Sequence, residues 1–338
     1  MRIRRALPVV LGLVVVAAAV TLAVQLRKHA PPEPARLLPG ADGFAYLDLA
    51  WVRRANVTGQ IPQTVHDPDY QKFIDQTGFQ FERDLDEVAV AIHFPQASSV
   101  PASAAKDAVA DATRFSEVFV GRIDGKKLRD YLRGLSSSVE TYNGVDIYVI
   151  PLEGRTVRAA ILTVDTVAVT NHSDSLVIRG MIDRSHKLAS PFGGPALLRQ
   201  YYRRVPLASL AWAIVRADPT GALGTTSPIN WGFLFSKPAV VVASARYLGN
   251  VHVRAEAFTG SPEEAQTATD RVQAFVGIFR AAEISSGISG GSDPDMQKLF
   301  DSVKIEQSHE RAVLTAVLPV ALLRKVFEQS PLGETGSH

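Results

Sequence analysis

Hydrophobic and polar positions along this chain change their spacing from two residues to three or four, and back again. Alternation with a period of two, in stretches rich in β-branched residues, predicts β-strands. The clearest of these stretches are residues 44–50, 86–94, 116–124 and 207–218. Apolar positions three and four residues apart predict amphipathic helices at 125–135 and at about 262–282.

Short turns such as Gly249-Asn250 separate many of the predicted strands. Strands joined by tight turns pair antiparallel, whereas parallel strands need a long crossover, and no parallel βαβ unit is evident. The sequence therefore predicts an α+β fold. We expect one or two largely antiparallel sheets with amphipathic helices packed on one face.

A nine-residue motif occurs twice, as DPDYQKFID at Asp67–Asp75 and as DPDMQKLFD at Asp293–Asp301. Its first Asp suits a helix N-cap and its Pro suits the first helical position. In both places two predicted strands and a second helix follow, which gives an α-β-β-α order at each end. Either an internal duplication or convergent helix starts would explain the echo, and a functional signature is the least supported explanation.

The N-terminus carries an uncharged apolar run at residues 6–26, preceded by Arg2, Arg4 and Arg5 and followed by Arg27 and Lys28. A helix of this length spans about 30 Å, which is the thickness of a membrane hydrocarbon core. We expect a transmembrane anchor or uncleaved signal with a cytoplasmic N-terminus, so that most of the chain is extracytoplasmic, in the periplasm. Cleavage near Ala17–Ala19 is the alternative.

The domain organisation follows from this assignment. Residues 1–5 are predicted to be a cytoplasmic basic head, and residues 27–40 a stiff Pro-rich linker. Residues 41–205 and 206–330 are predicted to be two α+β halves. Residues 331–338 are predicted to be a disordered tail.

Composition removes several classes of chemistry. The chain of 338 residues has no cysteine, which excludes disulfides, thiol nucleophiles and cysteine metal sites. Its 36 basic and 34 acidic side chains give a formal net charge of +2, which gives no reason to expect a nucleic-acid partner. No Gly-rich phosphate loop follows a strand, so no cofactor is predicted.

Motifs for catalysis or metal binding are weak. The sequence GISGG matches a nucleophile elbow around Ser289, but a long predicted helix precedes it where a buried strand is required. No two histidines have the spacing of a helical zinc site. His93 and His252 lie in strand patterns and are expected to be ordinary strand residues. We therefore predict no catalytic, cofactor-binding or metal-binding residue, and no enzyme.

One aromatic segment is a candidate contact surface. The stretch INWGFLF places Trp231, Phe233 and Phe235 in a region with many loop-forming residues. If these rings are exposed they would bind a partner or a membrane, since aromatic anchors dominate interface energetics. The alternative is that the segment fills part of the core.

The start of the predicted globular part resembles a family. ARLLPGADGFAYLDL at Ala35–Leu49 and TGFQFERDLDEVAVAI at Thr77–Ile92 resemble uncharacterised, membrane-anchored, exported α+β proteins of bacteria. The resemblance lies mainly in residues 35–92, and it implies a leader followed by a long α+β domain. It implies no activity and no site residue.

These observations together predict a membrane-tethered extracytoplasmic protein that acts as a binding or scaffold module without catalysis. The membrane would be its partner through residues 6–26, with a protein or an apolar ligand as a further partner. A carrier of a lipid or other apolar ligand is the first alternative. An exported hydrolase is the second.

Overall fold

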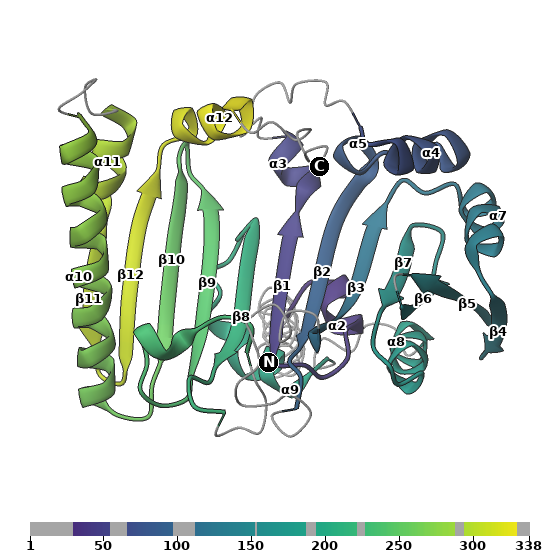
Figure 1. The fold of residues 1–338 in the computed structure, drawn as a ribbon, viewed down its shortest axis with the longest axis horizontal. Helices are drawn as coiled ribbons and strands as arrows, with labels where there is room; N and C mark the ends of the chain where they lie inside the picture. Colours follow the sequence, from purple (N-terminus) through teal and green to yellow (C-terminus); the bar gives the residue numbers. More distant parts are fainter. Residues whose placement is uncertain are drawn as a thin grey trace, which may run out of the picture.

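A computed structural model describes residues 30–54, 66–96, 112–152, 154–186, 194–221, 227–287 and 294–329. Its centre is one sheet of twelve strands, in which every paired neighbour is antiparallel (Figure 1). The order is β11-β12-β10-β9-β8-β1-β2-β3-β7-β6-β5-β4. The predicted α+β class with a largely antiparallel sheet is confirmed.

Strands of the first half of the chain occupy one side of the sheet. They are β1 Gly43–Asp48, β2 Leu85–His93, β3 Arg114–Gly121, β4 Ser138–Tyr142, β5 Val145–Leu152, β6 Arg155–Ile161 and β7 Thr166–Thr170. Strands of the second half occupy the other side. They are β8 Ala211–Ala217, β9 Ala239–Tyr247, β10 Val251–Phe258, β11 Lys304–Ser308 and β12 Arg311–Leu318. The two groups meet only where β1 pairs with β8.

The α-helices before β8 are short, and three of the seven, α3, α4 and α5, lie between the neighbouring strands β1 and β2. They are α2 Glu33–Leu37, α3 Leu49–Arg54, α4 Pro68–Thr77, α5 Phe81–Asp84, α7 Gly125–Leu135, α8 Leu176–His186 and α9 Ala196–Tyr201. Those after β8 are α10 Pro262–Gly287, α11 Pro294–Ser302 and α12 Val320–Gln329. Two 3₁₀ turns, η2 Tyr202–Arg204 and η3 Trp231–Phe233, complete the described elements.

Local sequence explains several boundaries. Asp67 caps α4, because its carboxylate accepts hydrogen bonds from Asp69 N and Tyr70 N, both at 3.0 Å. Gly78 ends the same helix with φ +70°, a backbone conformation that suits glycine. Asp124 caps α7 in the same way as Asp67 caps α4. The predicted capping role of the first motif copy is therefore confirmed, whereas Asp293 of the second copy lies outside the described residues.

Helices cover both faces of the sheet, so the expectation that they pack on one face is wrong. On β5, β6 and β7 the residues Tyr148, Ala159 and Val167 pack against α7. Their immediate neighbours on the same strands, Ile147, Ala160 and Ala168, pack with α8. Successive side chains of a strand point to opposite faces, so α7 and α8 lie on opposite faces of the sheet.

Strand register extends these two faces across the molecule. We call them the α8 face and the α10 face. Paired residues of antiparallel strands share a face. One row of paired residues on the α10 face runs through Ala257, Val241, Val215, Gly43, Ile92 and Phe115. Val241 and Ala257 pack in one cluster with Ala268 of α10, so α10 lies on this face. Phe119, four residues beyond Phe115 and therefore on the same face, pairs with Val167, so α7 lies on the same face as α10.

The two motif copies occupy different places in the sheet. The helix that begins with the first copy, α4, leads through α5 into β2 and β3, which lie between β1 and β7. The second copy leads into β11, an edge strand, and β12. The α-β-β-α order is present at both ends, but the strands are not equivalent. A closer internal correspondence is the pair of three-strand meanders β1-β2-β3 and β8-β9-β10, in each of which the third strand pairs with a strand that returns after a helix.

Residues 33–37, within the predicted Pro-rich linker 27–40, form the short helix α2. Proline is tolerated in the first turn of a helix, where the amide hydrogen that it lacks would have no helical partner. Ala35, Leu37 and Leu38 are buried in the core on the α8 face, and this burial stabilises the segment against an extended conformation.

Among the described residues, no helix has both the length and the apolar character needed to cross a membrane. The predicted anchor at residues 6–26, the head at 1–5 and the tail at 331–338 lie outside the described residues. The division into halves at residues 41–205 and 206–330 stays a prediction.

We predict that Gly121→Ala destabilises the fold by about 1–3 kcal/mol, because overpacking a tight contact costs this much. A Cβ atom on Gly121 would lie 2.4 Å from the Asp84 carbonyl oxygen. Gly134→Ala is the matched control, because its Cβ atom would meet nothing within 4 Å and alanine favours the helix. Urea unfolding monitored by circular dichroism measures both, and equal stabilities would contradict the predicted clash.

Candidate functional site

The central strands are covered very differently on their two faces. On the α8 face, Phe44, Ala89, Ala91, Val118 and Ile214 are completely buried. On the α10 face, the same strands and β9 carry apolar side chains that are only half-buried. We call these residues the apolar floor: Ala45, Leu47, Val88, Val90, Ile92, Ala211, Ala213, Val215, Val241, Ala243 and Ala245.

The size of the apolar floor is set by strand spacing. The floor residues lie on β9, β8, β1 and β2, which are separated by three inter-strand spacings of about 4.8 Å, and this gives a width of about 14 Å. Alanine and valine make up most of the floor, so its side chains extend only a short way from the sheet. A contiguous apolar area of this kind on a protein surface usually marks a site of binding to a ligand, a partner or a membrane.

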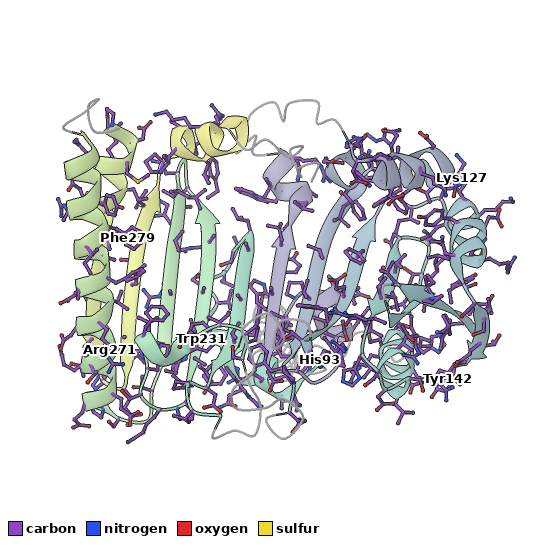
Figure 2. All side chains as sticks on the ribbon, in the orientation of Figure 1. His93, Lys127, Tyr142, Trp231, Arg271 and Phe279 are labelled. Carbon is purple, nitrogen blue, oxygen red and sulfur yellow. The ribbon has the colours of Figure 1, made fainter. Side chains whose placement is uncertain are left out.

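One boundary of the floor is an aromatic row formed by α10 and the 3₁₀ turn η3. Phe233, Phe275 and Phe279 contact one another in sequence, with ring centroids 5.8 Å and 4.8 Å apart, and about half of each ring is exposed. Gln273, on the other side of the helix, donates to Ile305 O of the edge strand. The aromatic row therefore faces the floor, and Figure 2 shows Phe279 on this inner side of α10.

The predicted contact segment joins this boundary to the sheet. Phe235 is 6% exposed and packs on Ala239 and Ala268, so it belongs to the core. Trp231 is half-buried in the same cluster, and its Nε1 donates to Ser227 Oγ at 3.2 Å. Phe233 alone of the three presents half of its surface. The structure thus places these rings beside the floor, and a contact role for them stays a prediction.

The opposite boundary contains an apolar cavity of about 150 Å³ between α4, α5, α7 and the sheet. Its lining is almost entirely apolar, and rings contribute much of it. The apolar lining residues are Phe73, Phe79, Phe81, Phe119, Ile123, Leu128, Leu132, Ala159, Val167 and Val169. We call it the aromatic cavity.

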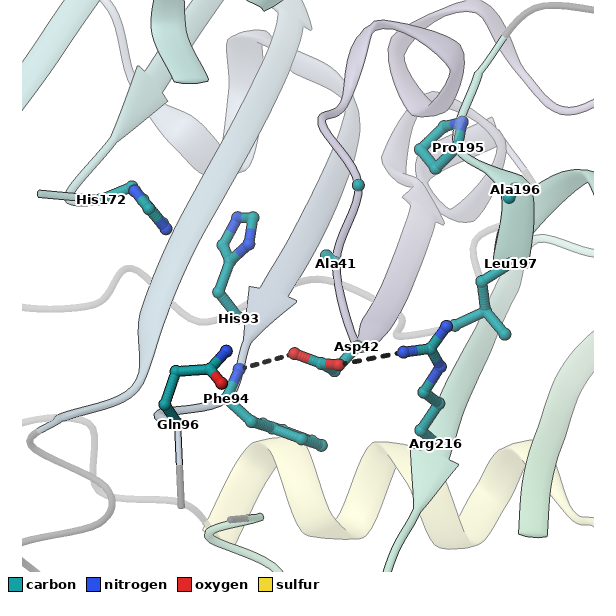
Figure 3. A pocket seen from close by; sticks show the side chains of 11 residues that line it. Ala41, Asp42, His93, Phe94, Gln96, His172, Pro195, Ala196, Leu197 and Arg216 are labelled. Atoms are coloured by element: carbon teal, nitrogen blue, oxygen red, sulfur yellow. Dashed lines mark hydrogen bonds and ion pairs between the residues drawn. The ribbon is translucent and has the colours of Figure 1, made fainter. Parts of the chain in front are cut away.

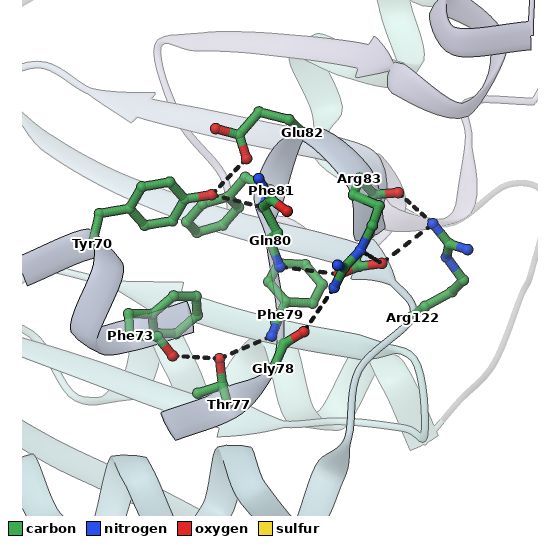
Figure 4. A network of polar contacts seen from close by, with 11 residues as sticks. Tyr70, Phe73, Thr77, Gly78, Phe79, Gln80, Phe81, Glu82, Arg83 and Arg122 are labelled. Carbon is green, nitrogen blue, oxygen red and sulfur yellow. Dashed lines mark hydrogen bonds and ion pairs between the residues drawn. The ribbon is translucent and has the colours of Figure 1, made fainter. Parts of the chain in front are cut away.

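Polar contacts hold the turn that carries two of these rings (Figure 4). Tyr70 Oη donates to Glu82 Oε2 and accepts from Phe81 N, both at 2.8 Å. Thr77 Oγ1 donates to Phe73 O at 2.7 Å and accepts from the next turn's amide, Phe79 N, at 3.1 Å. These bonds fix the backbone at the rings, and Phe81 also stacks on Tyr70 and Phe73 with centroids 5.5 Å and 5.7 Å away.

Asp84 ties the same turn to β3. Its carboxylate accepts from Gln80 N at 3.0 Å, pairs with Arg83 at 2.6 Å, and pairs with Arg122 at 3.2 Å. Burial works to raise the pKa of Asp84, but the bonds from Arg83 and Gln80 and the two arginine charges hold it below its usual range. Asp84, which belongs to the acidic stretch Glu82–Glu87, therefore has a structural role.

A single charged residue lies on the α10 face of the central strands. At the paired positions of β1, β2, β3, β8 and β9 on this face, only Glu117 is charged. Val90 and Val169 lie opposite it on the two neighbouring strands. Burial alone raises the pKa of the Glu117 carboxyl above its ordinary value, because no described charge is near enough to offset it.

A separate polar pocket of about 400 Å³ lies where β2 ends, and its walls include His93, His172, Asp42 and Arg216 (Figure 3). The rings of His93 and His172 meet edge to face, with centroids 5.0 Å apart. The Asp42 carboxylate accepts from Phe94 N at 3.0 Å and pairs with Arg216 at 3.4 Å. Sequence reasoning did not bring these residues together, because they come from four distant segments.

The chemistry that this pocket can support is limited by the contacts that its own side chains make. Burial, and after it the nearby His172, lowers the pKa of His93 to about 4, so its ring is neutral at pH 7. His93 Nε2 contacts Ser116 Oγ at 2.9 Å, but this hydroxyl is fully buried and also bonds Thr170 Oγ1 at 2.8 Å. Among the described residues, no group of three histidine or acidic side chains could hold a metal ion. Ser289 lies outside the described residues.

Comparisons with known proteins give a distant similarity only. No family model matches the chain, and no curated protein matches it. Crystal forms IV, III and I of TP0453 are similar at 12% identity, with TM-scores of 0.42, 0.44 and 0.44. Each similarity covers 88% of this chain and 98%, 99% and 97% of the respective TP0453 chain. The resemblance of residues 35–92 to exported bacterial proteins stays a prediction.

We predict that Glu117→Gln stabilises the free protein at pH 7 by about 1 kcal/mol, because a neutral amide costs less to remove from water than a half-buried, ionised carboxylate. A carboxyl whose folded pKa is raised keeps its proton while the unfolded chain releases it, so wild type loses stability as pH rises above about 4.3. The advantage of the variant should therefore vanish below that pH. Thermal unfolding at pH 3.5 and pH 7 measures it, and a variant less stable at pH 7 would contradict the assigned environment.

Proposed function

We propose that this chain is a membrane-tethered extracytoplasmic binding protein, without catalysis, whose ligand is a molecule with long apolar chains such as a lipid. The ligand would lie on the apolar floor, between the aromatic row of α10 and the aromatic cavity. The observation that carries the proposal is the half-exposed state of the whole floor, beside strands that are fully buried on their other face.

Shape and composition favour a slender apolar ligand over a folded protein partner. A stable protein interface buries about 800 Å² on each side and includes a polar rim. The floor is about 14 Å wide, is made of small side chains, and has rings at both boundaries. Apolar lining with aromatic side chains and few polar groups is typical of small-molecule sites, and each buried methylene contributes about 0.8 kcal/mol.

The tether rests on the apolar run at residues 6–26 and on its cationic flanks. A binding protein held at a membrane surface would meet lipids that leave the bilayer. Its open face would then take up an apolar chain without a deep tunnel, because the floor is a surface and not a closed cavity.

We predict that a photoreactive hexadecyl probe labels the full chain, in its own membranes, at peptides from β1, β2, β8 and β9. Ala213→Asp should reduce this labelling at least tenfold, because it places a charge in the centre of the floor. Val164→Asp is the matched control, since Val164 is 87% exposed in a turn away from the floor. Mass spectrometry of digested protein locates the label, and labelling unchanged by Ala213→Asp would overturn the proposed site.

We also predict that the full chain stays with membranes after an alkaline carbonate wash, and that protease added outside the cytoplasmic membrane digests its globular part. Intact mass decides between a retained anchor, which keeps Arg2 to Arg5, and cleavage near Ala17–Ala19. Release by the wash together with an uncleaved N-terminus would contradict the tether.

A further inference from the structure

Glu117 interrupts an otherwise apolar surface. It lies in the middle of β3, with Phe115 and Phe119 two residues away on the same face and Val90 and Val169 opposite. No hydrogen bond or ion pair joins its carboxylate to the part of the chain that the structure describes, and burial is the only influence on its titration.

The position demands an explanation because a carboxyl is costly there. Strand neighbours on this face are valine, isoleucine and phenylalanine, and any of these would fit the surface. Removing a carboxylate from water without a compensating partner lowers the stability of the folded state. A partner supplied by a bound molecule would offset that cost when the site is occupied.

The aromatic cavity lies directly beside this carboxyl. Phe119 and Val169, which flank Glu117 along and across the strands, also line the cavity. A cavity of about 150 Å³ lined by apolar side chains is large enough for a benzene-sized group. An apolar end and a negative group are therefore placed next to each other, at the boundary of the floor.

We propose that Glu117 makes the site selective for amphiphiles with a cationic, ammonium-type head group. The ammonium group would donate to the Glu117 carboxylate, and the apolar part would lie on the floor and in the aromatic cavity. This inference rests on the proposed function, because it names the ligand class of the same site. A charge-assisted hydrogen bond in a poorly solvated place is stronger than a neutral one, so an alcohol should bind less well. A carboxylate head would be repelled.

The test is competition against the hexadecyl photoprobe on the full chain in its own membranes. Octylamine, octanol and octanoic acid are added at pH 7, where the first is a cation and the last an anion. In wild type we expect octylamine to displace floor labelling at a concentration about tenfold or more below that needed for the other two. In Glu117→Gln and in Glu117→Val this preference should vanish while labelling persists.

Glu306→Gln is the matched control, because Glu306 is an exposed glutamate on the α8 face of the edge strand β11. This variant should keep the wild-type preference for octylamine. That result would show that the preference does not come from a general electrostatic attraction of cations to the membrane. Equal competition by the three compounds in wild type would overturn the inference and leave the proposed function standing. A preference that survives in Glu117→Val would also overturn it, and absence of any floor labelling would overturn both proposals.

Discussion

The pairing of β1 with β8 is the contact on which the architecture depends. Five residue pairs, from Gly43↔Val215 to Leu47↔Ala211, join the strands of the first half to those of the second. On the α8 face this seam is reinforced by Tyr46 and Trp212, whose rings stack at 5.6 Å, and by Tyr202, which meets Trp212 edge to face at 5.3 Å. Without the seam there would be two smaller sheets, each with a new exposed edge.

The same seam creates the apolar floor. Because alternate side chains leave a strand on opposite faces, a strand that stacks Tyr46 on Trp212 must present Ala45 and Leu47 on the other side. The α8 face is filled by α2, α8 and α9, which bring Leu37, Ile182 and Leu198 into the core. On the α10 face, helices stand at the two ends of the sheet, beside β11 and β12 and over β3 to β7 (Figure 1).

Local features of this fold could be predicted from the sequence, and long-range ones could not. Helix α7 begins and ends where its apolar spacing predicts, because that signal lies within a dozen residues. Glu117 was not predicted as a site residue, although its alternation with Phe115 and Phe119 places a carboxyl among rings on one strand face. The two-residue alternation of a strand does not show whether one of its faces is covered. Alanine and valine recur with the same spacing in a buried core and on an open floor. That distinction needs the sheet order and the placement of α10.

The two ends of the floor differ chemically, so the two orientations of a molecule bound along it are not equivalent. At the α10 end about half of the surface of Phe233, Phe275 and Phe279 is exposed. At the other end the Tyr70 and Asp84 contacts hold the cavity wall, and beside it lies a carboxyl that has no partner among the described residues. A symmetric hydrocarbon would gain nothing from this difference, whereas a molecule with one polar end would bind in one orientation. The asymmetry also explains why Glu117 can persist at a cost to the free protein, because binding sites commonly trade stability for recognition.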